Sequence, residues 1–222
     1  MEKQTWGVRA LDWLDERLEV KTLLEEFLRK PVPAHASHWM YCLGGATAFF
    51  ALVQGITGIL LALYYRPTPE EAYDSILLIM NEVRFGWLIR SMHSWSATLM
   101  VVFGFLHLLR VYLTGSYKPP RELNWIAGVL LGITTLAFSF TGYLLPWDQR
   151  AYWATTIGTD MAGTVPLVGG IILRLLRGGS EITALTLSRF YGAHMLILPL
   201  VFVLLVGVHF IMIRRQGISG PL

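Results

Sequence analysis

SMHSWSATLMVVFGFLHLL, residues 91–109, contains no aspartate, glutamate, lysine or arginine. A helix of about 20 apolar residues is long enough to cross the roughly 30 Å hydrocarbon core of a bilayer. Three longer charge-free runs occupy residues 39–65, 123–147 and 190–213. The sequence therefore predicts an all-α fold, an integral membrane four-helix bundle.

The composition supports lipid as the main solvent of this chain. Apolar residues make up 54% of the 222 residues and charged residues only 15%, and the mean hydropathy is +0.52, whereas soluble domains carry about a quarter charged residues. The net charge of +3 is small and dispersed, which excludes nucleic acid as a partner. A fifth apolar patch, residues 161–173, is too short to cross and contains Pro166, so we expect it at the membrane interface.

The N-terminal segment has the pattern of an amphipathic helix. Over residues 5–30 one helical face carries Val8, Leu11, Leu14 and Leu18, and such a helix can lie on a membrane surface or dock on a partner protein. Both charge signs are dense here, so the segment is not a signal peptide. We divide the chain into residues 1–34, an N-terminal surface helix and linker, and residues 35–222, the transmembrane bundle.

Basic residues near the ends of the predicted spans indicate the topology. They gather before the first span, between the second and third, and after the fourth, at Arg29, Lys30, Lys118, Arg121, Arg214 and Arg215. The first connection is acidic, and basic residues also occur in the third. The positive-inside rule therefore places both termini on the cytoplasmic or stromal side. With four spans, the second and fourth run parallel.

Four of the six histidines lie inside predicted spans, where an ionisable side chain is by default a functional candidate. The second span carries His93 and His107, an i, i+14 pair, and the fourth carries His194 and His209, an i, i+15 pair. These spacings are about 21 and 22 Å along a helix, and the second histidine returns to within roughly 40° and 60° of the first. Because the spans are parallel, we expect His93 level with His194 and His107 level with His209.

Two level pairs of imidazoles about 20 Å apart are typical of two bis-histidine b haems. Flanking arginines, above all Arg90 and Arg214 and with Arg110 just after His107, can balance the haem propionates. Zinc is disfavoured because neither pair has the further ligands that it needs. The competing interpretation is that the histidines are hydrogen-bonded packing residues. His35 and His38 precede the first span and are interpreted as surface histidines.

The glycines repeat the spacing of the histidines. Gly44 and Gly58 on the first span form an i, i+14 pair, as do Gly128 and Gly142 on the third. A flat macrocycle between the second and fourth spans would press on the first and third, where only glycine lets a ring approach the backbone. Glycine is common in membrane helices, so the pattern gains weight only beside the histidines.

Long strings of this sequence extend the pattern well beyond single residues. They are ERLE (16–19), YCLGG (41–45), YYRPT (64–68), FGWLIRSMHSWSA (85–97), RVYLTG (110–115), PREL (120–123), TGYLLPWDQ (141–149), SRFYGAH (188–194) and RRQGISGPL (214–222). Over essentially its full length the chain resembles the cytochrome b6 family, the amino-terminal half of the cytochrome b fold in b6f-type complexes. The i, i+15 spacing on the fourth span and the four-span length favour this branch over the longer mitochondrial-type cytochromes b.

The resemblance implies a transmembrane electron-transfer subunit of a b6f-type quinol:cytochrome c/plastocyanin oxidoreductase. Two b haems would carry electrons from an outer quinol-oxidation site to an inner quinone-reduction site, coupled to proton translocation in a bacterial cell membrane or thylakoid. The implied partners are a subunit IV-like protein with the remaining helices, a Rieske iron–sulfur protein, a c-type cytochrome and lipid quinone, in a dimeric complex. The quinol-oxidising Pro-Glu-Trp-Tyr motif of the family is absent from this sequence, so we expect no quinol oxidation by this chain alone.

Cys42 is the single cysteine, so an intrachain disulfide is impossible. Taken by itself, a cysteine near a helix end is interpreted as a small apolar filler, and no Cys-x-x-Cys-His motif is present. In the family that the chain resembles, the matching cysteine holds an extra haem through one thioether beside the inner b haem. The resemblance therefore implies a covalent c-type haem at Cys42.

Two further alternatives stay open at the level of the sequence. A haem b membrane anchor of a dehydrogenase or hydrogenase also uses four helices, and a haem-free structural membrane protein would share the composition. Tyr143, Pro146 and Trp147 at the end of the third span are candidates for the outer quinone pocket or for an interfacial aromatic belt.

Overall fold

The computed structural model describes residues 6–18, 29 and 31–220, and all regular structure in this part of the chain is helical. Four helical segments are long and apolar enough to cross a membrane. They are α3 (Leu43–Ala62), α5 (Gly86–Leu113), α6 (Glu122–Leu144) and a continuous segment made of α9 (Ala184–Gly192), the π turn η3 (Ala193–Ile197) and α10 (Leu198–Gln216). The prediction of an all-α bundle with four spans is confirmed.

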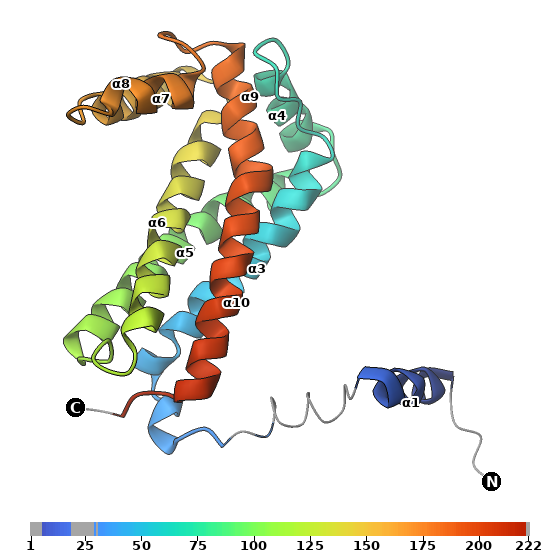
Figure 1. Ribbon diagram of the computed structural model, residues 1–222. Helices are drawn as coiled ribbons and strands as arrows, with labels where there is room; N and C mark the ends of the chain where they lie inside the picture. The colour runs from blue at the N-terminus through green and yellow to red at the C-terminus, as the bar shows by residue number, and fades with distance from the viewer. Residues whose placement is uncertain (1–5, 19–28, 30, 221–222) are drawn as a thin grey trace.

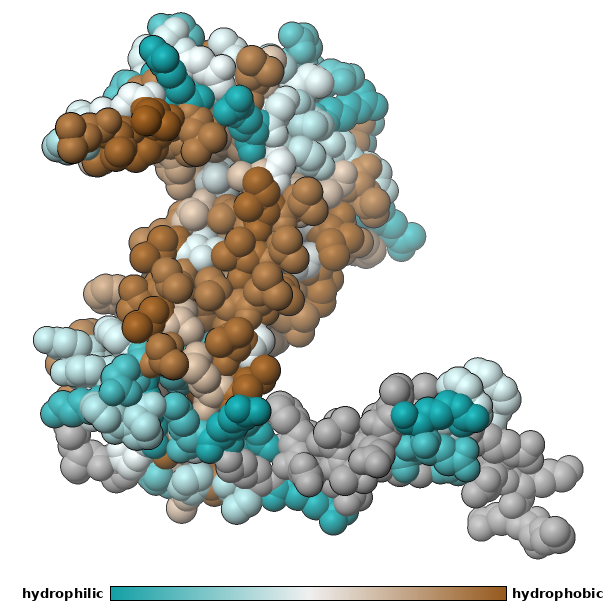
Figure 2. Space-filling view, in the orientation of Figure 1, coloured by the Kyte–Doolittle hydropathy of each residue, from teal (hydrophilic) through white to brown (hydrophobic). Residues whose placement is uncertain are grey.

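The surface of the bundle fits a lipid environment. Figure 2 shows that hydrophobic side chains cover the middle of the bundle on the face in view, with hydrophilic side chains gathered above and below them. Large apolar side chains of the four long helices are exposed, among them Phe105 and Leu204 at 65% and 62%. A helix forms all its backbone hydrogen bonds within itself, so it can be surrounded by lipid. The exposed apolar side chains of the bundle therefore fit a position inside the membrane.

The four long helices alternate in direction, so the connections define two ends of the molecule (Figure 1). The first carries α4 (Ala72–Asn81), α7 (Gln149–Gly163) and α8 (Gly169–Arg177), and we call it the α7 end. The second carries the start of α3, the turn between α5 and α6 and the end of α10, and we call it the C-terminal end. Two short 3-10 helices, η1 (Ala34–Ser37) and η2 (Trp39–Tyr41), lead into α3 there.

Helix pairing is regular inside the bundle. The closest partner of α3 is α5, and α6 packs against α10, α5 and the π turn. A fully buried cluster of Leu144, Ala151 and Phe190 joins α6, α7 and α9 at the α7 end. The histidine-bearing helices α5 and α10 are therefore flanked by α3 and α6.

The α7–α8 hairpin extends sideways from the bundle (Figure 1). Arg177 is buried in it and donates from Nε to Thr159 Oγ1 at 2.7 Å and from Nη2 to Asp160 Oδ1 at 2.7 Å. The apolar patch expected at the interface, residues 161–173, spans the end of α7, the turn and the start of α8. Figure 2 shows hydrophobic side chains over this arm, and the exposed large apolar side chains of α8 include Ile171 and Leu175.

Helix boundaries differ from the charge-free runs for a simple reason. α5 is 28 residues long and includes Arg90 and Arg110, because a charged side chain near a span end can remain part of the helix, half-buried like Arg90 or stacked on the Tyr41 ring like Arg110. The predicted amphipathic helix over residues 5–30 is described as α1 (Trp6–Leu18). Residues 19–28 and 30, and the side chains on its expected apolar face, lie outside the described part, so that face stays a prediction.

Candidate functional site

The structure places two of the four predicted histidines close together near the C-terminal end. His107 on α5 and His209 on α10 have ring centres 6.5 Å apart, with ring planes at 89°. This separation leaves room for one metal atom bonded at about 2 Å to a nitrogen of each ring. Both side chains are partly buried between helices.

The other two histidines, His93 on α5 and His194 in the π turn, lie toward the α7 end and each contact a threonine. Thr57 Oγ1 on α3 is 2.8 Å from His93 Nδ1, and Thr141 Oγ1 on α6 is 3.0 Å from His194 Nδ1. Phe138 packs edge-on against His194, with ring centres 5.4 Å apart. A histidine that binds a metal usually forms a hydrogen bond through its other ring nitrogen, and this bond fixes the orientation of the ring. The threonines of α3 and α6 are placed to do this for His93 and His194.

Each of the four predicted glycines lies against one histidine. An ideal Cβ placed on the glycine would be 3.0 Å from Cε1 of His107 at Gly44 and 2.8 Å from Cε1 of His194 at Gly142. The corresponding distances are 3.4 Å to His93 at Gly58 and 3.5 Å to His209 at Gly128. The glycines thus leave space for the imidazoles, and their predicted role in making room for a macrocycle stays a prediction.

The π turn explains why the two histidine spacings differ by one residue. Its five residues include His194, and the N–H of Leu198 donates to the carbonyl of Ala193, five residues earlier. One turn with this wider hydrogen-bond loop takes up one extra residue. The i, i+15 spacing from His194 to His209 therefore acts like an i, i+14 spacing in a regular α-helix, so α5 and the fourth span present their histidines with the same offset.

Arg110 is one of the flanking arginines that the sequence predicted as partners of the haem propionates. It is 7% exposed, its guanidinium lies 3.8 Å from the centre of the Tyr41 ring, and its Nε and Nη2 have no hydrogen-bond partner. Unsatisfied buried guanidinium nitrogens are costly and call for an anion. A haem propionate near His107 has the required charge, so this end of the bundle fits the group.

The predicted arginines occupy the expected ends of their helices. Arg90 is half-buried near the start of α5, and its Nη1 lies 3.7 Å from Met80 Sδ of α4. Arg214 is half-buried in the last turn of α10. Neither placement identifies a propionate, so their role stays a prediction.

Cys42 is exposed and stands immediately before α3. Its Sγ is 3.7 Å from the carbonyl oxygen of His38. Because Gly44, just after it, faces His107, the thiol is at the same end of the bundle as the His107/His209 pair. Outside the spans, His35 Nε2 lies 3.0 Å from the carbonyl oxygen of Ser219.

A cavity of about 350 Å³ opens between α6 and α7, and its wall is formed by Ser139, Phe140, Tyr143, Ala154 and Thr155. Of the three aromatic-pocket candidates, Tyr143 lines this cavity. Trp147 instead packs against the buried cluster at the α7 end and has a positive φ of 53°. Pro146 is not part of the cavity wall.

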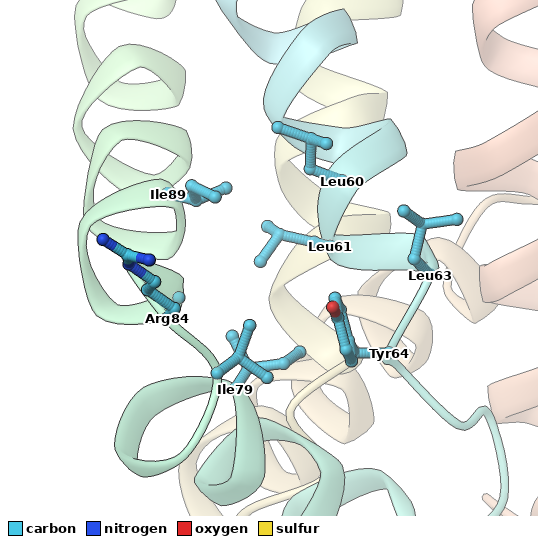
Figure 3. Close-up of a pocket in the computed structure, with 9 residues that line it drawn as sticks. Leu60, Leu61, Leu63, Tyr64, Ile79, Arg84 and Ile89 are labelled. Carbon is cyan, nitrogen blue, oxygen red and sulfur yellow. The ribbon is translucent and has the colours of Figure 1, made fainter.

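A smaller pocket of about 150 Å³ lies between α3, α4 and the start of α5 (Figure 3). Figure 3 shows apolar side chains from all three helices around it, with Arg84 at its side. Its lining residues are Leu60, Leu61, Leu63, Tyr64, Ile79, Val83, Arg84, Gly86 and Ile89. None of the four span histidines lines it.

The donor set matches pairs of axial ligands. Among the described residues no three His, Cys, Asp or Glu side chains are grouped to hold a metal ion by themselves. The histidines instead come as two on each of two parallel spans, and a bis-histidine haem needs two protein ligands and supplies the other four from its ring. The geometry therefore suits two haems stacked across the bundle.

Comparison with known proteins agrees with this assignment. The family model for cytochrome b/b6/petB matches residues 27–217. Cytochrome b6 of Heliobacterium mobile is 53% identical over 213 residues, covering 96% of this chain and 100% of the relative, and that of Emiliania huxleyi is 52% identical, covering 95% and 98%. A chain of a hyperthermophilic respiratory complex III superposes with a TM-score of 0.81 at 34% identity. The match covers 95% of this chain and 56% of that one. The chain belongs to the cytochrome b/b6 family.

Proposed function

We propose that this chain is the haem-carrying, transmembrane electron-transfer subunit of a b6f-type quinol:cytochrome c/plastocyanin oxidoreductase. The observation that carries the proposal is the placement of four histidines as two pairs on α5 and the fourth span, each histidine facing a glycine of α3 or α6. The cytochrome b6 relatives and the complex III neighbour support the class of complex.

The histidines hold the iron of two b haems, His93 with His194 and His107 with His209. When bound, the haems supply two one-electron redox centres. The protein fixes their separation, because the step from His93 to His107 spans about 21 Å of helix. The α7 end is the outer side in this proposal, and both termini lie on the cytoplasmic or stromal side, as the basic residues of the C-terminal end indicate.

The quinol-oxidation site is built partly from this chain. The cavity beside Tyr143 opens at the α7 end, near the His194 level, and has an apolar wall that suits a quinone ring. Oxidation of the quinol would release two protons and two electrons, of which the haem held by His93 and His194 would accept one and a Rieske iron–sulfur protein the other, with a c-type cytochrome or plastocyanin as the next acceptor. A subunit IV-like chain completes the pocket, in a dimeric complex that translocates protons.

Charged and thiol groups at the C-terminal end serve the inner haem. Arg110, buried with two free guanidinium nitrogens, and Arg214 balance its propionates, and Arg90 does so at the other end. Cys42 carries a c-type haem through one thioether, which its exposure and its position before α3 permit. A haem that stays on the denatured chain and disappears in Cys42→Ser would support this link; a Cys42 peptide of bare mass would exclude it.

The direct test of the proposed function removes one histidine. His93→Ala should abolish one low-spin b haem and leave the other at its original midpoint potential, as measured by redox titration of the purified complex. His38→Ala, outside the spans, is the control and should retain both. Two unchanged b haems in His93→Ala would refute the assignment, and copurification without an iron–sulfur protein would favour a dehydrogenase or hydrogenase anchor.

A further inference from the structure

Two threonines occupy equivalent positions beside the histidines of the α7 end. Thr57 precedes Gly58 on α3, and Thr141 precedes Gly142 on α6, so both lie next to a glycine that faces an imidazole. Both are buried, at 4% and 8% exposure. Their hydroxyl oxygens are 2.8 and 3.0 Å from the Nδ1 atoms of His93 and His194.

The direction of these hydrogen bonds follows from the other partners of the hydroxyls. Thr57 donates to the carbonyl of Val53 at 2.6 Å, and Thr141 donates to the carbonyl of Ala137 at 2.8 Å. A hydroxyl has one hydrogen, so toward the imidazole each threonine can only accept. The ring proton therefore sits on Nδ1, and Nε2 keeps its lone pair for a metal.

The pair at the C-terminal end has no such hydroxyl. The residues that precede Gly44 and Gly128 are Leu43 and Ala127, both buried and without a polar side-chain atom. A glycine therefore faces each histidine at both levels of the bundle, but a threonine precedes that glycine only at the level of His93 and His194. Among the described residues, His209 Nδ1 is buried without a hydrogen-bond partner, whereas the Nδ1 atoms of His93 and His194 contact threonine hydroxyls.

We propose that Thr57 and Thr141 are positioning residues that fix the tautomer of His93 and His194 and lower the reduction potential of the haem they hold. The proposal rests on the assignment of these histidines as haem ligands. An acceptor on Nδ1–H makes the imidazole a more basic ligand, which stabilises ferric more than ferrous iron. Burial of both threonines keeps water from replacing the acceptor.

The functional consequence is a direction for electron flow within the chain. With the potential of the haem at His93 and His194 lowered by the two threonines, electron transfer to the haem that His107 and His209 would hold would be energetically downhill. Without the two threonines the difference in reduction potential between the two haems would be smaller. The electron would then spend more time on the haem at the quinol-oxidising end.

The test replaces each hydroxyl by a methyl group of similar size and titrates the b haems of the assembled complex. In Thr57→Val with Thr141→Val, the reduction equilibrium constant of the outer haem should rise about ten-fold, which is about 59 mV for one electron. The inner haem should keep its potential. Thr57→Ser with Thr141→Ser retains both hydroxyls and should restore the wild-type value.

The matched control is Thr134→Val. Thr134 is a buried threonine of α6 that bonds the carbonyl of Leu130 and no histidine, so its loss should move neither potential. Electron paramagnetic resonance adds a second readout, because the g-values of the outer ferric haem should change in the valine variants and return in the serine variants.

The outcomes separate this inference from the proposed function. Two b haems in the wild type with unchanged potentials and g-values in the valine variants would overturn the role of the threonines and leave the haem assignment intact. Absence of b haem from the wild-type complex would overturn the proposed function itself. If the valine variants lose the outer haem, retention in the serine variants supports the hydroxyl role, and equal loss in both contradicts it.

Discussion

The four imidazoles are approached by glycines at different distances, and these distances rank the sites. Space is tightest at Gly142 and Gly44, where a Cβ would lie 2.8 and 3.0 Å from a ring carbon. At Gly58 and Gly128 it would lie at ordinary contact distance, 3.4 and 3.5 Å. A methyl group at the first two positions must push a ligand ring, because the helix backbone that carries it cannot move alone.

Gly142→Ala should therefore displace His194 and remove or strongly perturb the outer b haem, lowering the b-haem content of the purified complex by up to half. Gly128→Ala should retain both haems, and Gly207→Ala on α10, where no atom lies within 4 Å of the added carbon, is the control for helix substitution. The haem content is measured by the pyridine haemochrome spectrum. Normal content and potentials in Gly142→Ala would show that the ring has room to shift.

The intramembrane histidines could be predicted from the sequence because an ionisable side chain is costly in a membrane. The glycines could be predicted because they repeat the histidine spacing, and the structure places each of them against a histidine. Thr57 and Thr141 did not stand out, because a threonine in a membrane helix ordinarily bonds its own preceding turn, and these two do so as well as contacting histidine. Arg110 was predicted as one of the arginines that balance the haem propionates, and the structure adds that it is buried with two guanidinium nitrogens that have no hydrogen-bond partner.

At the scale of helices, the fourth span differs from α5 because its two histidines are separated by 15 residues and those of α5 by 14. In a regular helix the extra residue would turn His209 by about 100° relative to an i+14 position. The π turn Ala193–Ile197 absorbs the extra residue just where His194 sits. The i, i+15 spacing was visible in the sequence, but a π turn forms from tertiary packing and has no clear sequence signal.

Deleting Leu196, a 70% exposed residue of the π turn, should convert the turn into α-helix and keep both b haems, because the spacing becomes i, i+14. Deleting Val102, 45% exposed on α5 between His93 and His107, should turn His107 by about 100° and remove the inner haem. Both deletions remove a lipid-facing aliphatic residue, so they are matched. Redox titration of the b haems compares them.

Equal haem loss in the two deletion variants would mean that the π turn is not the element that sets the register. The same contrast also distinguishes the histidine pairs as ligands from histidines that only pack, since a packing residue tolerates rotation far better than an axial ligand does.

At the scale of the whole molecule, the sequence predicted the architecture where hydrophobicity alone decides it. Charge-free length indicates a span, so α3, α5, α6 and the fourth segment were all expected. The α7–α8 hairpin was anticipated only as an interfacial patch, because its helices are short and are held by long-range contacts. Arg177 is the example: its burial depends on Thr159 and Asp160 of the facing helix.

The molecule also presents an open face where the quinol would bind. Tyr143, which lines the cavity between α6 and α7, is 53% exposed. Quinol oxidation needs a site that excludes water and positions an acceptor for the second electron. In the proposed function this chain supplies an acceptor for one electron and part of the pocket.

The isolated full chain in detergent should therefore bind both b haems, which dithionite reduces reversibly, and should show no quinol:cytochrome c reductase turnover. The reducible haems are the internal control, since they show that the preparation is folded and loaded. Adding the subunit IV-like chain and the iron–sulfur protein should restore turnover, because they close the cavity beside Tyr143 and take the second electron. Steady turnover by the single chain, measured with a short-chain quinol and soluble acceptor, would mean that the exposed wall is already a complete site.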